Sequence, residues 1–296
     1  MLTFDAAVVS NVGPRPDNQD SAVVGPRLVA VADGVGGNVG GAVASSLVAG
    51  WLVPLSASRT HVEPGAEGLL DVITGANERL AAAVSLTPRL RTMATTLVTV
   101  LLDETGCTVG HIGDSRVYLL RDGQLSQVTS DHSLVQALID AGQLTPAQAA
   151  VHPQRSVVYA ALHGDVDDRA GVDLITVDVQ VGDRFLLCSD GLSDVVPADR
   201  LEAGLAGAET PQAAAKALVE TALDAPAHDN VTVVVGDVRE PPEGRLAPVR
   251  TVGAAAALRQ ETAAALEALW PASRVPDLQR DRVTQITEPL GRPPLA

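Results

Sequence analysis

The sequence contains no uninterrupted apolar run that approaches the roughly 18 residues needed to span a bilayer. A membrane-spanning segment is therefore not expected, and neither is a membrane partner. The first ten residues, MLTFDAAVVS, lack the basic segment followed by a long apolar one that marks a secretory signal. From these two absences we expect a cytoplasmic protein.

Basic residues and cysteines are also scarce. Lys216 is the only lysine, and 21 basic residues against 36 acidic ones leave a formal net charge of −15. A surface this acidic repels a phosphate backbone, so nucleic acid is not expected as a partner, whereas so many carboxylates can ligate hard cations. Cys107 and Cys188 stand in apolar stretches, which indicates buried thiols and not a disulfide framework or a zinc site.

The charge balance changes near residue 239. Residues 239–296 carry eight arginines and seven acidic residues, which leaves a net charge of −16 on residues 1–238. The Pro/Gly-rich segment EPPEGRLAPVR at this boundary is typical of a linker. We therefore expect one folded domain over residues 1–238 and a Pro/Ala-rich tail over 239–296, with a helix at about 254–270. That helix either packs loosely on the domain or docks a partner through its apolar side.

Strands and helices are predicted in blocks, not in strict alternation. β-rich runs occupy residues 6–10, 27–32, 95–102, 107–112, 116–120, 173–179, 184–188 and 231–238. Helical patterns occupy residues 40–53, 68–86, 132–142 and 211–224. The pair Asp122-Gly123 predicts a hairpin turn. Two long helices in succession between β-rich blocks favour an α+β fold in which helices cover antiparallel sheets.

Aspartates recur where the predicted strands begin or end. They are Asp20, Asp33, Asp114, Asp190 and Asp229. A strand end fixes the backbone of such a residue and leaves its carboxylate at the rim of the sheet, where it can bind an ion. Any one of them alone would be interpreted as a turn residue, because aspartate is common in turns.

Several carboxylates that converge without basic partners repel one another by several kcal/mol at short range, so cations must neutralise them. Ligation by oxygen alone selects Mg²⁺ or Mn²⁺ over zinc or copper. Two such ions about 4 Å apart, bridged by a carboxylate and a hydroxide, would also supply a nucleophile at neutral pH.

Six motifs follow one another along the chain. They are RPDNQD (15–20), ADGVGG (32–37), ATT (94–96), GDSR (113–116), SDGLSD (189–194) and DN (229–230). In this order they resemble the metal-dependent protein serine/threonine phosphatases of type 2C, in their bacterial branch, over about residues 3–238. The resemblance implies a β-sandwich of two antiparallel sheets flanked by helices on both sides (α-β-β-α). It also implies hydrolysis of phosphoserine and phosphothreonine in proteins, in opposition to a bacterial Ser/Thr protein kinase.

The resemblance further implies two Mn²⁺ or Mg²⁺ ions, with a third, weaker one in bacterial members. The metal ligands that it implies are Asp20, Asp33, Gly34 through its carbonyl, Asp114, Asp190, Asp194 and Asp229. Asp33 would bridge the two main ions, and the hydroxide between them would attack phosphorus in line. Asp114 and Asp194 would hold the third ion.

Two further residues would contact the substrate if the resemblance holds. Arg15 would grip the phosphoryl oxygens, which suit its planar, bidentate guanidinium. His152 lies in a segment that forms a mobile flap over the cleft in relatives, and it would touch the substrate. Two positions depart from the animal members: Gln19 replaces a metal-associated Glu, and Val35 replaces a His that protonates the leaving group, so the general acid is left open.

Other functions are weighed against this one. The segment DGVGGNVGG (33–41) lacks the GK[ST] ending of a nucleotide-binding P-loop and the spacing of a dinucleotide fingerprint. A non-catalytic docking module with the same fold would have lost metal ligands, and none is missing. A phosphatase of anti-anti-sigma regulators stays open as an alternative, although such proteins usually carry sensory domains before the phosphatase.

Overall fold

The computed structural model describes residues 2–36, 40–57, 65–103, 106–225, 227–242 and 247–257. Its strands are β1 (Thr3–Asn11), β2 (Ser21–Val24), β3 (Leu28–Ala32), β4 (Gly34–Val35), β5 (Ala94–Thr95), β6 (Leu97–Leu102), β7 (Cys107–Ile112), β8 (Arg116–Arg121), β9 (Gln124–Gln127), β10 (Asp173–Val177), β11 (Arg184–Cys188), β12 (Val231–Arg239) and β13 (Arg250–Gly253). Its helices are α1 (Gly40–Ala57), α2 (Ala66–Leu86), α3 (Leu134–Asp140), α4 (Pro146–Ala149), α5 (Asp190–Ser193), α6 (Ala198–Ala206) and α7 (Pro211–Asp224), with 3-10 turns at Pro88–Leu90 and Val166–Gly171.

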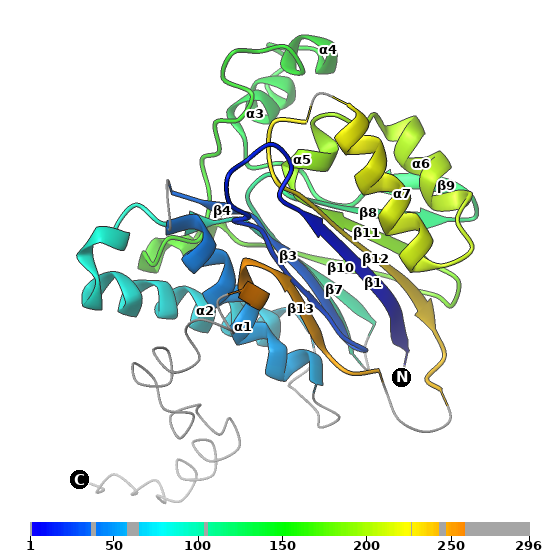
Figure 1. Ribbon diagram of the computed structural model, residues 1–296, viewed down its shortest axis with the longest axis horizontal. Coiled ribbons are helices and arrows are strands. Elements are labelled where there is room, and N and C mark those ends of the chain that lie inside the picture. Colours follow the sequence, from blue (N-terminus) through cyan, green and yellow to red (C-terminus); the bar gives the residue numbers. More distant parts are fainter. Residues whose placement is uncertain are drawn as a thin grey trace, which may run out of the picture. The chain divides into compact units, whose positions relative to one another are not determined.

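Two antiparallel sheets contain most of the described strands (Figure 1). One sheet has the strand order β1-β12-β11-β8-β9, and the other has the order β10-β7-β6-β3-β2-β13. Strands β4 and β5 form a short separate pair. Residues of both sheets, among them Val29 of β3 and Val234 of β12, meet in one apolar cluster, so the sheets pack face to face.

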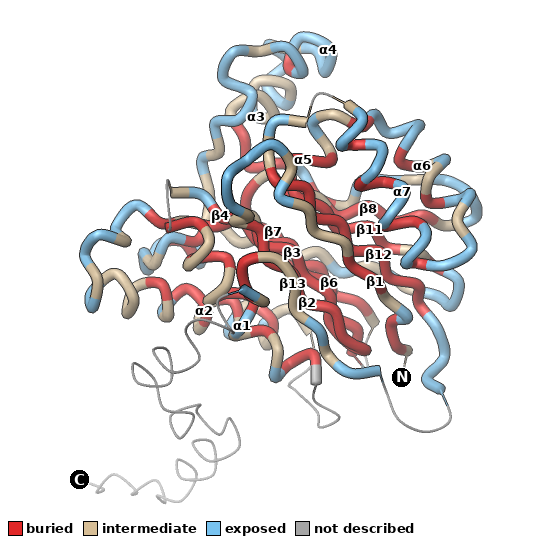
Figure 2. The backbone as a smooth tube through the Cα atoms, viewed as in Figure 1, coloured by how far each residue is buried: buried red, intermediate tan, exposed pale blue. Residues whose placement is uncertain are grey.

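Strand β3 shows how the sequence produces the layers. Its run LVAVA is buried throughout, as expected for a strand covered on both faces (Figure 2). Val29 and Val31 contribute to the cluster between the sheets, whereas Leu28 and Ala30 pack with α1 and α2 on the outer face. On the other side, α6 and α7 cover the sheet of β12 through residues such as Leu218. The predicted α+β fold, a sandwich with helices on both sides, is confirmed.

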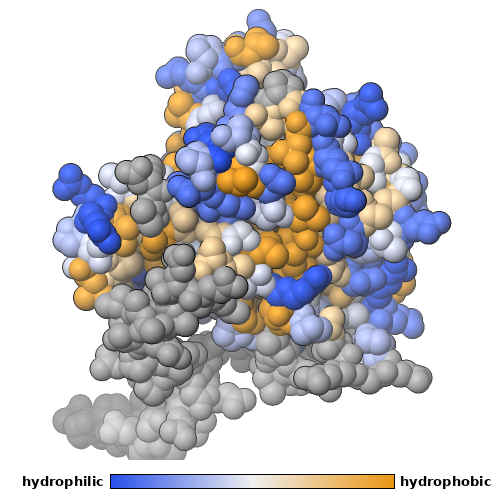
Figure 3. All heavy atoms as spheres, viewed as in Figure 1, coloured by the Kyte–Doolittle hydropathy of each residue, from blue (hydrophilic) through white to orange (hydrophobic). Residues whose placement is uncertain are grey.

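The outer helices have one apolar face and one hydrophilic face. In α7 the residues Ala214, Leu218 and Val219 are buried, while Lys216 and Glu220 form an exposed pair 3.6 Å apart. The face drawn in Figure 3 accordingly shows hydrophilic side chains over this layer and hydrophobic ones along the middle of the molecule. In the part of the chain that is described, no helix combines the length and the apolar character needed to cross a membrane.

The hairpin predicted at Asp122-Gly123 joins β8 to β9. Arg121 pairs with Gln124, so the loop has two residues, and both lie in the left-handed region with φ of 51° and 78°. This is the turn whose twist matches the flanking strands, and Asp-Gly is one of the sequences that favours it.

Exchanging glycine for alanine should change the free energy of unfolding in opposite directions at Gly123 and Gly50. At both positions the added methyl group would meet open space. Gly123→Ala should lower the free energy of unfolding by about 1 kcal/mol, because alanine is strained at positive φ. Gly50→Ala, within α1, should raise it by about 0.5–1 kcal/mol, because alanine loses less backbone entropy in a helix. Urea unfolding of both variants measures the difference, and two changes of the same sign would contradict the assigned conformations.

The folded unit extends past the boundary expected at residue 238. After the Pro/Gly-rich segment, β13 pairs with β2 at the edge of the sheet, with Arg250 opposite Val24 and Gly253 opposite Ser21. Ala254 and Ala255 follow in the helical conformation and are buried. This strand was missed because RTVG is short and follows a linker-like segment. Most of the helix expected at about 254–270 lies outside the described residues.

Candidate metal centre

Asp33 stands at the end of β3, with its backbone held on both sides. Its N–H donates to the Thr96 hydroxyl at 3.1 Å, while its carbonyl accepts hydrogen bonds from the Thr95 hydroxyl and the Thr96 N–H, both at 2.9 Å. A Cβ on the next residue, Gly34, would collide with the carbonyls of Gly41 and Gln19. Only glycine fits there, so the ATT motif and Gly34 together fix the position of the Asp33 carboxylate.

Asp20 connects the two sheets at this end of the sandwich. It precedes β2 of one sheet and is almost fully buried. Its Oδ2 accepts a hydrogen bond at 2.8 Å from the hydroxyl of Ser189, which follows β11 of the other sheet. The same Ser189 oxygen accepts the N–H of Thr232 in β12 at 3.0 Å. One serine thus places Asp20 against the ends of two strands of the opposite sheet.

Asp190 and Asp229 come from those two strands. Asp190 begins α5 directly after β11, and Asp229 lies just before β12. Because β11 and β12 are antiparallel neighbours, the end of the first lies beside the start of the second, as the Ser189 N–H to Thr232 carbonyl bond of 3.1 Å shows. Topology, not sequence distance, therefore brings the two aspartates together.

Asp114 and Asp194 complete the group. Asp114 lies two residues after the end of β7, and Asp194 follows α5, its N–H donating to the Asp190 carbonyl at 2.8 Å. Asp194 is also approached by Nε of Arg155 at 3.9 Å. This ion pair joins the segment after α4 to the carboxylate group.

The pKa values of these aspartates reflect burial and mutual repulsion. Burial, followed by the charges of Asp20, Asp190 and Asp114, holds the pKa of Asp33 well above its usual range. Burial, followed by Asp114 and Asp194, does the same for Asp190. Burial is also the main reason why the pKa values of Asp20 and Asp114 rise to about 6. The sequence hypothesis required these acids to converge, and the structure brings them together.

The donor set fits hard divalent cations. Asp20 Oδ1 and Asp190 Oδ1 are buried, and neither has a hydrogen-bond partner among the described residues. A buried carboxylate oxygen without a partner is costly unless a cation or donor satisfies it. Since the surrounding ligands are oxygens, the site suits Mg²⁺ or Mn²⁺.

Arg15 lies at the rim of the group, about half exposed. Its Nη2 donates to Asp229 Oδ2 at 2.6 Å and its Nε donates to the His228 carbonyl at 2.9 Å. The guanidinium is thereby fixed beside the carboxylates at the solvent side, where a phosphoryl group could reach it.

Among the described residues, the hydrogen bonds of His152 stay within its own turn. Its Nδ1 accepts the N–H of Gln154 at 3.2 Å and its N–H donates to the Ala149 carbonyl at 3.1 Å. Arg155, three residues later, is the residue of this segment that approaches the Asp194 carboxylate. Val35, whose side chain cannot donate a proton, is 53% exposed.

Asn230 is a supporting residue to which the sequence hypothesis gave no role. Its side-chain oxygen accepts the Gln19 N–H at 2.8 Å, and its amide donates to the carbonyls of Val12 and Asp17 at 2.8 and 2.9 Å. It therefore ties the loop that carries Arg15 to the start of β12. The Asp-Asn pair before an apolar strand was the only signal for it.

Asn230→Ala should lower the free energy of unfolding by about 2 kcal/mol or more. The substitution leaves one part-buried N–H and two part-buried carbonyls without the buried Asn230 side chain, and each such loss costs on the order of 1 kcal/mol. Gln212→Ala, at an exposed position of α7, should change it by less than about 0.5 kcal/mol. Denaturant unfolding of both variants tests this, and equal stabilities would show that the loop does not depend on Asn230.

The sequence is similar to a protein family and to several bacterial phosphatases. The model of the family described as Protein phosphatase 2C matches residues 15–225. The serine/threonine protein phosphatase PstP of Mycobacterium tuberculosis is 43% identical over 238 residues, which cover 79% of this chain but 45% of PstP. The chain thus spans less than half the length of that relative. The serine/threonine phosphatase stp of Listeria monocytogenes is 33% identical over 211 residues, covering 70% of this chain and 83% of stp.

Solved structures show the same fold. The catalytic domain of PstP, in complex with two manganese ions, has a TM-score of 0.73 at 40% identity and covers 81% of this chain and 100% of its own. The serine/threonine phosphatase Stp1 of Staphylococcus aureus has a TM-score of 0.73 at 31% identity, covering 80% of this chain and 96% of its own. With its motifs, its fold and its converging carboxylates, this chain belongs to the protein phosphatase 2C family.

Proposed function

We propose that this protein is a metal-dependent phosphatase that hydrolyses phosphoserine and phosphothreonine in proteins. The observation that carries the proposal is the group of aspartates at one end of the sandwich, in which Asp20 and Asp190 each present a buried carboxylate oxygen that has no hydrogen-bond partner in the described part of the chain. Such a group is tolerable only when cations offset its repulsion. The named relatives, PstP and stp, are serine/threonine phosphatases.

Two Mn²⁺ or Mg²⁺ ions are assigned to this group of aspartates. Asp33 would be shared between the ions, with Asp190, Asp229 and the Gly34 carbonyl as further ligands, and Asp20 would hold a water at the site. When bound, the ions lower the pKa of water and polarise the phosphoryl oxygens. A third ion would lie at Asp114 and Asp194, where the contact with Arg155 would have to give way.

Arg15 is assigned to the phosphoryl group of the substrate. Its position at the exposed rim lets it offer N–H groups to the phosphoryl oxygens while Asp229 and the His228 carbonyl hold its plane. A fixed fork of donors is most favourable as negative charge develops in the transition state. Val35 has no proton to give, so the leaving alkoxide takes its proton from water or from another residue.

The substrates are proteins phosphorylated by a Ser/Thr kinase, because such kinases produce these phosphoesters. The protein would therefore oppose a kinase and act on that kinase and its targets. Cys107 and Cys188 are free, buried thiols, which agrees with a reaction in the reducing cytoplasm.

Hydrolysis of a phosphothreonine peptide and of p-nitrophenyl phosphate tests the proposal. Activity should require Mn²⁺, stop on chelation and be lost in Asp190→Asn, while Asp199→Asn, on the exposed surface of α6, should behave as wild type. Equal activity with Mn²⁺, with chelator and in Asp190→Asn would refute the proposal. Mn²⁺ binding without hydrolysis would favour a docking module, and a faster rate on a phosphorylated anti-anti-sigma regulator than on a phosphorylated kinase loop would favour that substrate.

A further inference from the structure

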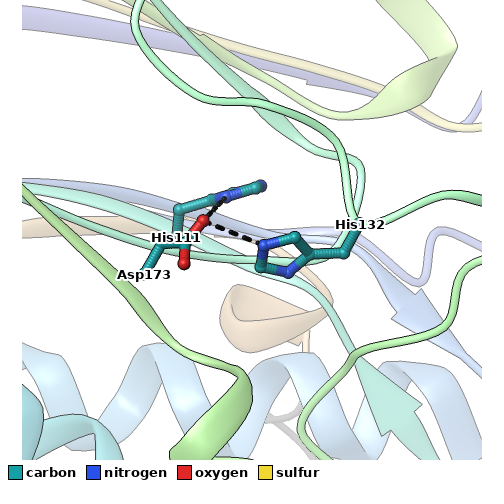
Figure 4. A group of neighbouring side chains, drawn as sticks. All are labelled: His111, His132 and Asp173. Atoms are coloured by element: carbon teal, nitrogen blue, oxygen red, sulfur yellow. Dashed lines mark hydrogen bonds and ion pairs between the residues drawn. The ribbon is translucent and has the colours of Figure 1, made fainter. Parts of the chain in front are cut away.

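A second group of titratable side chains lies next to the aspartates but is separate from them. His111 of β7, His132 before α3 and Asp173 of β10 come together, as Figure 4 shows. Asp173 Oδ2 lies 3.0 Å from His132 Nε2 and 3.9 Å from His111 Nδ1. The two imidazole rings are 4.5 Å apart between centroids. His111 is completely buried, whereas the Asp173 side chain is about half exposed.

The hydrogen bonds of His132 assign its tautomer. The backbone N–H of Gly113 donates to His132 Nδ1 at 3.2 Å, so Nδ1 carries a lone pair and not a proton. The ring proton of the neutral imidazole is then on Nε2, and it points at the Asp173 carboxylate. Asp173 therefore selects the tautomer in which Nδ1 can accept, in the way that a carboxylate orients a histidine in other sites.

His132 forms hydrogen bonds with both backbone groups of Gly113, its N–H and its carbonyl. Besides the bond to Nδ1, the His132 N–H donates to the Gly113 carbonyl at 2.8 Å. Gly113 has φ of 110°, and an added Cβ would lie 2.5 Å from the Thr96 side chain, so the glycine backbone is seated tightly against Thr96. The hydroxyl of Thr96 accepts the Asp33 N–H and bonds to Ser115 at 2.7 Å. The Gly113 backbone that His132 holds therefore lies between Asp114, the next residue, and Thr96, which supports the backbone of Asp33.

We propose that His132 and Asp173 are positioning residues, which hold the Gly113 peptide and through it the Asp114 carboxylate. The metal-binding part of this inference rests on the proposed function, whereas the positioning of Gly113 does not. Asp173 keeps Nδ1 of His132 free of a proton, Nδ1 accepts from Gly113, and the direction of the next side chain is fixed. The sequence motifs contain Gly113 and Asp114 but not Asp173, which topology alone brings to this place.

The same geometry argues against a cation held by the three side chains. A cation on His132 Nε2 would displace the ring proton to Nδ1, where it would oppose the Gly113 N–H. His111 gives the ring of His132 a neutral neighbour, because burial lowers the pKa of His111 to about 4.

Nuclear magnetic resonance of the metal-free protein tests the positioning without any metal. Two-bond ¹H–¹⁵N correlations should show His132 as the Nε2–H tautomer in wild type and in Asp173→Asn, whose amide oxygen still accepts, but as a mixture in Asp173→Leu. Exchange of the Gly113 N–H should be faster by about fivefold or more in His132→Leu, which loses the acceptor. In His132→Asn, whose side-chain oxygen can replace Nδ1, exchange should stay near wild type. An Nδ1–H tautomer in wild type, or unchanged exchange in His132→Leu, would overturn the proposal.

Calorimetric titration with Mn²⁺ tests the consequence for Asp114. His132→Leu should weaken the weakest Mn²⁺ binding step by about tenfold, a typical effect for a residue that orients a ligand. His132→Asn should stay within about threefold of wild type. Equal weakening in both variants would indicate a general packing effect and would overturn the positioning role. If wild type binds no Mn²⁺, the proposed function fails, while the tautomer and the exchange of Gly113 still decide the positioning of that glycine.

Discussion

Asp33→Asn should abolish Mn²⁺-dependent phosphatase activity, by about 10³-fold or more in kcat/KM, and should stabilise the metal-free protein at the same time. The loss follows because charge stabilisation by the ions contributes several kcal/mol to the transition state, and each 1.36 kcal/mol is a factor of ten. The gain follows because Asp33 is buried among carboxylates, and its negative charge is unfavourable when no cation is bound. Asparagine keeps the shape of the side chain and removes that charge.

Two measurements on one variant test this prediction. Phosphopeptide hydrolysis at saturating Mn²⁺ gives the activity, and thermal unfolding in chelator gives the stability, where a melting temperature a few degrees above wild type is expected. Asp5→Asn, at an exposed position of β1, is the matched control and should change neither. If Asp33→Asn melts below wild type in chelator, the carboxylate has a stabilising role that the repulsion argument does not allow.

The metal-free protein should lose stability as pH rises from about 4 to about 6. Burial raises the pKa of Asp20 to about 6 in the folded state, from an ordinary value of 3.8. Between these values the folded state holds a proton that the unfolded chain has released, so raising the pH favours unfolding. For Asp20 alone the loss is on the order of 3 kcal/mol. Asp33 and Asp190, whose pKa values are also raised, extend the fall to higher pH.

Urea unfolding in chelator at several pH values measures this slope. Asp20→Asn should make the slope less steep between pH about 4 and 6, because one of the titrating groups is gone while Asp114, whose pKa also rises to about 6, remains. Adding Mn²⁺ near pH 7.5 should restore about 2.7 kcal/mol for each site at a hundredfold excess over its Kd, provided that the unfolded chain does not bind the ion. A stability that rises over this pH range without metal would mean that the aspartates are stabilised in their charged form by groups other than cations.

Local pattern predicted most of the secondary structure because each strong signal depends on neighbouring residues. The run at 107–112 is found as β7, the helix expected at 211–224 is found as α7, and the Asp122-Gly123 turn is found in place. Short elements were missed where burial, not propensity, decides the conformation. Strand β13 forms because the edge of β2 offers a pairing partner, and the short segment RTVG by itself does not predict a strand.

The candidate site was predicted unevenly for the same reason. Aspartates at strand ends were visible in the sequence, and repulsion among them already indicated cations. The roles of Asn230 and Ser189 were not visible, because their hydrogen bonds reach residues more than one hundred and fifty positions away. The assignment of His152 to the substrate stays a prediction, and no role was predicted for Arg155 of the same segment, which contacts Asp194.

The sequence alone is enough to predict that this chain forms an α+β domain of the type 2C phosphatase kind with an oxygen-lined centre. The features that predicted this were composition, aspartates at strand ends and the order of the motifs. Each depends only on residue type and short spacing, so it can be recognised without the fold. Only the tertiary structure decided which acids share one end of the sandwich, which side chains hold them, and that His132 and Asp173 stand behind Asp114. Those contacts are made between loops and strand ends that sheet pairing brings together, and the order of strands in a sheet is set by packing of the whole domain, not by any local stretch of sequence.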